Sequence, residues 1–457
     1  MAISSFYGLQ TSLRGLLAQQ RLLDTTGHNI ANASTQGYSR QQAVLAASPA
    51  LMVPAGATST GAGAMLGSGV DVQQFTRVRD QFLDVQYRGQ ASNLADWTAQ
   101  AGALFNAETA LAEPGDNGIN AKLATFWNAW SDLANAPTSA AAKQALVSQG
   151  QALTDAIQTV RAQTATVAQQ SYAQYQDIVR PATATDPGGQ VAQIAKQIAA
   201  LNTTISQLKT SGDEPNDLED RRDQLLDQLS SLGQISVTNL SSGSLQVSFV
   251  DKASPGTTYP IVDDQNAVWA GPPAQDAWSP GGQIGGLLTV SKPGGTIDGY
   301  VSSLDSFATN LASMVNSVYG GTFLQVGATS AAATIQVNPA LVTNPNAVVA
   351  GSGNAGSNDL ALATAKLRGS AAIDGAYGAF VAKVGSQANE ANTQQANAQA
   401  LTDSVDNRRQ SVAGVSMDEE MTNLVKFQRA YQASARAMTT MDDMLDVLIN
   451  RTGKVGL

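Results

Sequence analysis

The stretch SMDEEMTNLVKFQRAYQASARAMTTMDDMLDVLIN, residues 416–450, repeats apolar side chains at alternating steps of three and four positions. Ser416 followed by Glu419 has the form of a capping box, which satisfies backbone N–H groups at the start of a helix. The repeat continues along one face through Leu424, Phe427, Tyr431, Met438, Met441, Leu445 and Leu448. Because an amphipathic helix gains most of its stability by burying its apolar face, this stretch predicts a helix with a partner. An ordinary core-facing helix of a globular domain would show the same pattern.

The N-terminal segment carries a similar but less regular pattern. Its apolar positions are Phe6, Leu9, Leu13, Leu16, Leu23 and Ile30. Gln20 and Gly27 interrupt the repeat, and Thr11, Ala18 and Thr25 occupy the opposite face. Chain ends are usually frayed, so a heptad-like pattern at both ends predicts that the two terminal helices pack together as in a coiled coil.

The run HNIANASTQGYSRQ, residues 28–41, follows this helix and contains the only histidine of the chain. Asn32, Ser34 and Gly37 are residue types that end helices and form turns, which predicts a helix end followed by a loop. A catalytic loop is the alternative, because Asn, Ser, Thr and Tyr side chains surround His28. A Ser/His/Asp triad would also need an oxyanion site and a partner acid, and no local motif supplies them.

Residues 41–232 and 371–414 are predicted to form a long-helix bundle domain. Residues 41–70 are rich in Gly, Ala and Pro and are read as an extended loop or a short hairpin. Helical spacing then resumes, and the face formed by Phe126, Trp127, Trp130 and Leu133 is interpreted as core rather than as a ligand cage. One long helix is expected from Ser139 to about Val179 before Pro181, followed by an antiparallel helical hairpin over residues 191–232.

At Gly233 the spacing of apolar residues changes from the three-to-four-residue period of a helix to the two-residue period of a strand. ISVTNLSSGSLQVSFV and TYPIVDDQNAVWAG each read as a hairpin, around SSG and DDQN respectively. Helical spacing interrupts the strands near residues 297–318, and helix resumes after residue 359. The expected fold class is mainly α with an inserted β-rich domain over residues 233–370. Residues 1–40 and 415–457 are assigned to a third, terminal helical unit.

Composition limits the functions that are possible. The chain has 457 residues, 36 acidic against 26 basic residues, and a formal net charge of -10. It has no Lys/Arg cluster, so nucleic acid is not an expected partner. The absence of cysteine excludes disulfides, thiolate metal sites and cysteine nucleophiles. No apolar run reaches the roughly 18 residues of a membrane span, and the N-terminus lacks the pattern of a cleaved secretory signal.

Candidate chemistry is sparse. The acidic clusters lie in a turn (Asp213 and Glu214), a helix start (Asp418 to Glu420) and a polar helix face (Asp442 and Asp443), where solvation and the helix dipole account for them. The glycines at 61, 63 and 67 resemble a dinucleotide-binding loop only weakly, because no βαβ pattern surrounds them. We therefore expect no catalytic residue, no metal site and no cofactor.

Both terminal stretches resemble the shared signature of bacterial flagellar axial proteins, the rod, hook and hook-associated subunits. Within this set the chain is most similar to the hook-associated proteins of the hook-filament junction. The resemblance extends to GSGVDVQQFTRVRDQFLDVQYRGQ, LATFWNAWSDLANAPTSAAAKQAL and NDLEDRRDQLLDQLSSLGQISV, so it covers nearly the whole chain. Asn29, Asn32, Gly37, Tyr38 and Arg40 match the terminal motif, which implies roles in capping, turning and contacting neighbours.

The resemblance implies a structural role outside the cell. Subunits of this kind are exported unfolded through the flagellar type III apparatus, bound beforehand by an export chaperone, and assemble into a helical ring on the flagellar hook protein. A second hook-associated junction protein and the filament are then added. The terminal helices would form the inner tube, and the β-rich domain would face outward.

Two features depart from the family pattern. Gln36 stands where Pro is common before Gly-Tyr, and the β-rich region is short beside that of longer relatives. A flagellar hook or distal rod subunit is the alternative, although the hairpin over residues 190–232 argues against it. A secreted hydrolase carried at the flagellar tip would need a catalytic pair, and the sequence shows none.

Overall fold

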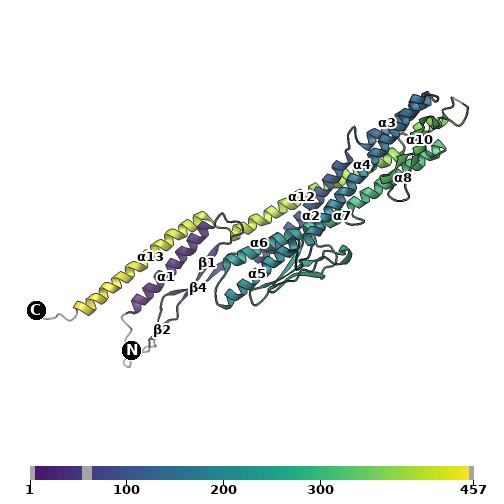
Figure 1. Ribbon diagram of the computed structural model, residues 1–457. Coiled ribbons are helices and arrows are strands. Elements are labelled where there is room, and N and C mark those ends of the chain that lie inside the picture. The colour runs from purple at the N-terminus through teal and green to yellow at the C-terminus, as the bar shows by residue number, and fades with distance from the viewer. Residues whose placement is uncertain (1–5, 54–63, 355, 452–457) are drawn as a thin grey trace.

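The computed structural model describes residues 6–53, 64–354 and 356–451, and it is elongated, with a pair of helices at one end and a longer body at the other (Figure 1). The pair consists of α1 (Tyr7–Ala31) and α13 (Met417–Asp446). Gly8 lies against Met441 and Gly15 against Ser434, so the two helices run in opposite directions. The predicted packing of the N- and C-terminal helices is confirmed.

A β-ribbon leads from α1 into the body. Strands β1 (Gln41–Ala47) and β4 (Val70–Arg77) pair in antiparallel fashion, and β2 (Leu51–Val53) and β3 (Ala64–Leu66) extend the ribbon. The hairpin alternative for residues 41–70 is therefore the correct one. The ribbon packs along α1, where the Tyr7 hydroxyl donates to the Leu66 carbonyl at 3.0 Å.

Long helices make up the far part of the body. They are α2 (Gln81–Leu111), α3 (Ile119–Asn135), α4 (Ala140–Val179), α8 (Thr296–Tyr319) and α12 (Ala376–Ala413). Phe126, Trp127, Trp130 and Leu133 are fully buried between them, as predicted, and Trp130 packs against the rings of Tyr319 and Phe323.

A second core lies nearer the terminal pair. Helices α5 (Gln190–Thr210) and α6 (Asn216–Leu232) form the predicted hairpin. They pack with an antiparallel sheet in the order β5 (Ile235–Asn239), β6 (Leu245–Val250), β7 (Thr258–Asp263), β8 (Asn266–Ala267). Along β6 the apolar residues Leu245, Val247 and Phe249 alternate with polar ones and are buried, which is the period-two pattern seen in the sequence.

Helix α4 connects the two cores. Its 40 residues span about 60 Å at the usual rise per residue. Leu146, Leu153 and Ile157 are buried in the far core, while Tyr175 and Ile178 are buried in the near one. The Ser139 side chain caps the first turn by accepting from the Ala142 N–H at 3.3 Å, so both predicted ends of this helix are confirmed.

The structure differs from the expected β-rich unit over residues 233–370. The four-stranded sheet ends at Ala267, and the following segment is mainly helical: α7 (Gly282–Ser291), α8, α9 (Ala331–Thr334), α10 (Pro339–Thr343) and α11 (Asp359–Ala365). In the described part of this segment the strands are the two-residue β9 (Leu324–Gln325) and β10 (Gln336–Val337). Helix α8 confirms the helical spacing predicted near residues 297–318. Short apolar runs fit a buried helix or turn as well as a strand, which is why the rest of this segment was expected to be β-rich. The division into three units remains a prediction.

Candidate functional site

The terminal pair joins the body through residues 29–40, whose side chains form many hydrogen bonds and ion pairs. At its start the buried Asn29 side chain connects the end of α1 to β1. Its amide donates to the Gln41 carbonyl at 2.9 Å, and its oxygen accepts from the Gln41 N–H at 3.0 Å and the Tyr38 hydroxyl at 2.8 Å. Asn29 therefore fixes the angle at which the chain leaves α1.

The loop between α1 and β1 follows the predicted turn chemistry. Asn32 is the C-cap of α1, and its side chain donates to the His28 carbonyl at 3.1 Å. Gly37 has a φ of +77°, and a Cβ at this position would overlap the Gln224 side chain. The backbone conformation therefore favours glycine here, and any larger residue would displace the Gln224 side chain of α6.

Ser39 and Arg40 attach this loop to two different helices. The buried Ser39 donates to the Asp220 carboxylate from its N–H at 2.8 Å and from its hydroxyl at 2.7 Å. The Arg40 guanidinium binds Glu419 and Glu420 at the start of α13, each at 2.8 Å. The Arg40 N–H also donates to the Ala413 carbonyl at 2.9 Å. The chain passes between the terminal pair and the body twice, in the α1–β1 loop and in the α12–α13 link, and these two segments are thus bonded to each other.

This contact corrects the reading of the acids at 418–420. Solvation and the helix dipole were the expected explanation, but Glu420 is buried and paired with Arg40. The Ser416 hydroxyl does cap the helix by accepting from the Glu419 N–H at 3.5 Å, so the predicted helix start is confirmed. The Glu419 carboxylate reaches Arg40 as well.

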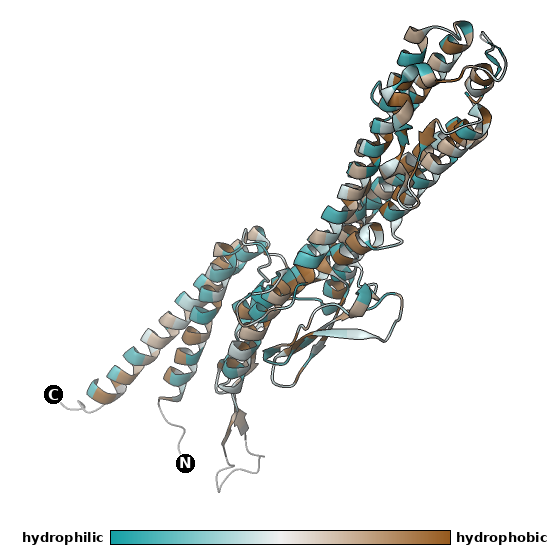
Figure 2. Ribbon diagram, turned by 45° about the vertical axis from the view of Figure 1, so that its right-hand side comes forward, coloured by the Kyte–Doolittle hydropathy of each residue, from teal (hydrophilic) through white to brown (hydrophobic). Residues whose placement is uncertain are grey.

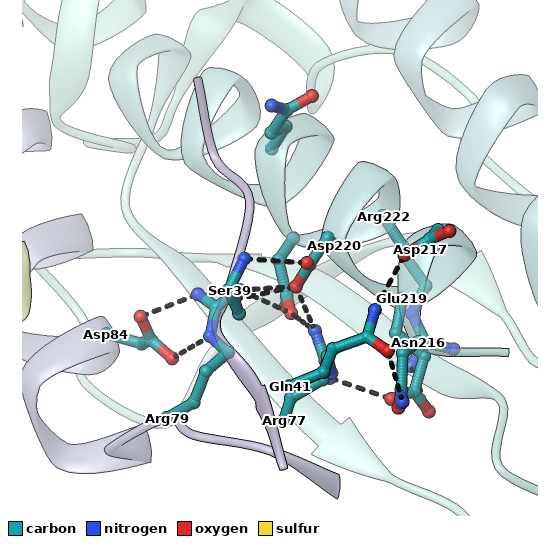
Figure 3. A network of polar contacts seen from close by, with 12 residues as sticks. Ser39, Gln41, Arg77, Arg79, Asp84, Asn216, Asp217, Glu219, Asp220 and Arg222 are labelled. Carbon is teal, nitrogen blue, oxygen red and sulfur yellow. Dashed lines mark hydrogen bonds and ion pairs between the residues drawn. The ribbon is translucent and has the colours of Figure 1, made fainter. Parts of the chain in front are cut away.

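Behind the loop, arginines from β4, the β4–α2 link, α2 and α12 face a row of carboxylates on α6. Figure 3 shows Arg77 and Arg79 beside Glu219 and Asp220. Arg77 contacts Glu219, Asp220 and Asp223 at 2.8 Å each. Further pairs are Arg79 with Asp84 (2.7 Å) and Asp223 (2.9 Å), Arg88 with Asp223 (3.2 Å) and Asp227 (2.8 Å), and Arg409 with Asp227 (2.6 Å). We call these residues the ion cluster.

Asp223 is the centre of the ion cluster, because Arg77, Arg79 and Arg88 all bind it. Burial acts to raise the pKa of the Asp223 carboxyl, but the three guanidinium groups lower it by more, and the pKa falls below its ordinary value. The Asp223 carboxylate therefore stays ionised to lower pH in the folded chain than in the unfolded chain.

Acid should weaken the joint in a defined pH window. Because the folded-state pKa of Asp223 is lowered, its contribution to stability is complete above the unfolded-state pKa of about 3.9 and is lost as the pH falls through the folded-state value. We expect the free energy of unfolding from chemical denaturation to fall as the pH drops below about 4 towards the folded-state pKa. Asp223→Asn should flatten this dependence, and an equal slope in both proteins would contradict the assignment.

His28 lies at the surface of the joint, beside Asp217 and Tyr38. Its Nε2 lies 3.4 Å from the Asp217 carboxylate, and its ring packs edge-on against Tyr38 at 5.5 Å between centroids. Both His28 and Asp217 are exposed, and the polar neighbours on this loop are engaged in holding the loop itself. Across residues 6–53, 64–354 and 356–451, no group of three or more His, Asp or Glu residues is arranged to hold a metal ion.

Replacement of His28 is expected to have little effect. His28→Gln keeps a polar side chain at this exposed position, so stability should change by within about 0.5 kcal/mol. Chemical denaturation should give nearly the same midpoint for this variant as for the natural chain. A large loss of stability would show that the imidazole has a specific role in the joint.

The apolar row predicted along one face of α13 packs beside α1. Leu424, Phe427, Tyr431, Met438 and Leu445 are half-buried, and Met441 contacts Gly8 while remaining partly exposed. The side chain of Leu448 lies outside the described residues. At the start of α13 the apolar residues Met417, Met421 and Val425 are exposed, Met421 by 52%.

The buried face of α1 differs from the apolar face that the sequence predicted. The buried face of α1 consists of Ala18, Leu22, Thr26 and Asn29, so Ala18 is not on an outer face. Leu9, Leu16, Leu23 and Ile30 are half-buried, whereas Phe6 and Leu13 are exposed, Leu13 by 44%. Leu17, which was not predicted, is 48% exposed. Figure 2 shows apolar residues along both terminal helices, which stand apart from the body.

The ion cluster was missed by sequence reasoning. Its one local signal is the spacing of Glu219, Asp223 and Asp227, which puts three carboxylates on one stripe of α6. The arginines that bind them come from residues 77–88 and from residue 409, so the pairing depends on the tertiary fold.

No helix in the described ranges is long and apolar enough to cross a membrane. Three families match this chain: "Flagellar hook-associated protein FlgK helical domain" over residues 104–331, "Flagellar basal body rod FlgEFG protein C-terminal" over 407–451, and "Flagella basal body rod protein" over 9–38. The two rod-type matches cover α1 with its loop and the end of α12 with α13.

Two relatives that match nearly the whole chain are both named flagellar hook-associated protein 1. The chain is 31% identical to flagellar hook-associated protein 1 of Bacillus subtilis (strain 168), with 99% of each chain covered. It is 22% identical to flagellar hook-associated protein 1 of Escherichia coli (strain K12), covering 97% of this chain and 99% of that one. The flagellar hook junction protein FlgK from Burkholderia pseudomallei is similar in structure with a TM-score of 0.44 and 20% identity, over 53% of this chain and 47% of that chain.

Proposed function

Since this chain belongs to the flagellar hook-associated protein 1 family and is a structural subunit of the hook-filament junction, we propose that it forms the adapter ring there through its terminal helix pair. In this ring α1 and α13 line the inner tube, the ion cluster fixes the angle of the joint, and the body faces outward. The observation that carries the proposal is the pair of apolar rows left exposed on α1 and α13.

These rows fit contacts between copies. Helices α1 and α13 cover each other only along the line where they pack together. The remaining sides of the two helices are open to neighbouring copies. Leu13 and Leu17 on α1, and Met417 and Met421 on α13, stay at the surface of a single copy. Burying each such side chain contributes about 1.5–3 kcal/mol, and the gain recurs in every subunit of the ring. Packing of terminal pairs against their neighbours is therefore favourable without any change of fold.

The family relationship supports the rest of the proposal. As a component of the extracellular flagellum, the subunit associates with the hook. We propose that it docks on the distal end of the hook protein and supports a second hook-associated junction protein, on which the filament grows. We also propose export without a cleaved signal peptide, assisted by a chaperone that binds α13, whose exposed methionines suit an adaptable helix-binding surface.

A deletion strain tests the proposal directly. Electron microscopy of cells that lack this chain should show hooks of normal length without filaments, and flagellin should accumulate in the medium. Expression of the chain from a plasmid should restore the filaments, and antibody labelling should locate it between hook and filament. Cells without hooks would instead indicate a hook or distal rod subunit.

A further inference from the structure

The β-ribbon has an apolar face that is open to solvent. Met52 of β2 and Met65 of β3 lie directly opposite each other in the ribbon and are 70% and 68% exposed, and we call this pair the methionine face. Successive side chains of a strand point to opposite faces, so the half-buried Leu66 belongs to the face that packs beside Tyr7 of α1. In the described part of the copy, one face of the ribbon is thus covered and the methionine face is open.

Helix α1 has an exposed apolar row of its own. Leu13 and Leu17, which we call the leucine row, are 44% and 48% exposed. Gly15 lies on the side where α13 packs, and Thr11 lies on the side where Gly69 of the ribbon packs. At 3.6 residues per turn, both leucines lie about 160° around the helix from Gly15, and about 160° and 120° from Thr11. The leucine row therefore faces away from both neighbours that α1 has within its copy.

Charge does not oppose a contact between these two surfaces. Residues 41–70 of the ribbon contain no Asp, Glu, Lys or Arg, although two copies of a chain with net charge -10 repel each other overall. Beside the leucine row, Arg14 turns to its own ribbon and donates to the Ser68 carbonyl at 3.3 Å. Arg21 and Asp24, which follow the row along α1, are of opposite sign. The ribbon of a second copy can therefore approach the row without added repulsion.

The two surfaces also lie close together along the axis of α1. The Tyr7 hydroxyl donates to the Leu66 carbonyl, so the methionine face is level with the start of the helix. Leu13 and Leu17 follow Tyr7 by six and ten residues, which is about 9 and 15 Å along the axis. A second copy in the same orientation, displaced by about 9–15 Å along α1, brings its Met65 level with the leucine row.

We propose that the methionine face of one copy packs on the leucine row of the next copy, so that each ribbon lies between two α1 helices. Every copy carries one such face and one such row, so contacts between copies cover both in equal number. Any other partner would cover one of them and leave the other open. A contact between two different surfaces repeats from copy to copy and builds rings or helical arrays. The inference rests on the proposed ring assembly and names the element that covers the exposed side of α1.

Site-specific photo-cross-linking in isolated flagella identifies the neighbour of the methionine face. A photoreactive phenylalanine analogue replaces Gly67, which follows Met65 by two residues and has no described atom within 4 Å of an added Cβ. Both methionines are kept. We expect a dimer of this chain, with the cross-link in the tryptic peptide of residues 15–21, which contains Leu17. The same analogue at Gly299, an exposed glycine of α8 that is equally free of described neighbours, is the control and should give no dimer.

Paired substitutions test whether the two surfaces touch. In the photoreactive chain, Met65→Lys alone and Leu17→Glu alone should each lower the dimer yield about tenfold, because each places a charge in an apolar contact. Both together should restore most of the yield, since the two charges then pair across the contact. Independent sites would instead multiply to a loss of about a hundredfold. Leu401→Lys, at a position that is 54% exposed on α12, is the control and should leave the yield unchanged.

Four results would overturn the inference. They are a photoproduct with the hook protein or another protein in place of the dimer, a dimer cross-linked outside α1, a multiplied loss in the paired variant, and no dimer although the chain is present in the flagella. Absence of the natural chain from flagella that carry filaments would refute the proposed function instead. Immunoblotting of the same flagella tells the two failures apart.

Discussion

Asp223→Asn should lower the free energy of unfolding by about 3–5 kcal/mol, because it removes the carboxylate that pairs with three arginines. Arg77, Arg79 and Arg88 are only 11–17% exposed and bind Asp223 within 3.2 Å. Without this charge, buried guanidinium groups are left with fewer partners and repel one another. Chemical denaturation followed by circular dichroism measures the change.

A second aspartate serves as the control for this experiment. Asp213 lies exposed in the turn between α5 and α6, so Asp213→Asn should change stability by within about 0.5 kcal/mol. Equal effects of the two substitutions would show that the ion cluster does not stabilise the joint. A shortened protease-resistant fragment from Asp223→Asn would locate the damage, since the terminal pair should be released first.

Cells that carry Met438→Asp together with Leu445→Asp should secrete the subunit but fail to grow filaments. Both side chains are half-buried on the face of α13 that lies along α1. Each carboxylate would be placed in an apolar contact without a partner, at a cost of several kcal/mol that recurs in every subunit. Microscopy should show hooks without filaments, and flagellin should be found unpolymerised in the medium.

Arg436→Gln is the matched control for the double aspartate variant. Arg436 lies exposed on the same helix, and its replacement should leave filament growth unchanged. Secretion of each variant is measured separately by immunoblotting of the culture medium, because α13 is also the proposed chaperone-binding segment. Normal filaments on cells with the double aspartate variant would refute the importance of this face.

The sequence predicted the elements with long, regular patterns. The helix α13, the capping Ser416 and the helical hairpin were predicted correctly, since each signal lies within one segment. The buried tryptophans were assigned correctly for the same reason, because Phe126, Trp127 and Trp130 share one helical face.

The contact face of α1 could not be read from apolar spacing. Its leucines form an apolar row, but Gly8 and Gly15 mark the side on which α13 approaches, because glycine lets helices come close. A row of leucines shows that a partner is needed and does not tell whether the partner is in the same copy or in a neighbour. The ion cluster was missed because its charges come from segments that only the fold brings together.

One consequence of the joint concerns mechanics. The chain crosses between terminal pair and body twice, at residues 39–41 and 413–417, and the Arg40 N–H bonds the two crossings to each other. Twisting the pair about its long axis pulls both covalent crossings in opposite directions, and it must also break the bonds of Ser39 to Asp220 and of Arg40 to Glu420. The joint therefore resists torsion as a rigid coupling rather than a swivel. In a flagellum that rotates as one body, each subunit can then pass torque from its terminal pair to its body.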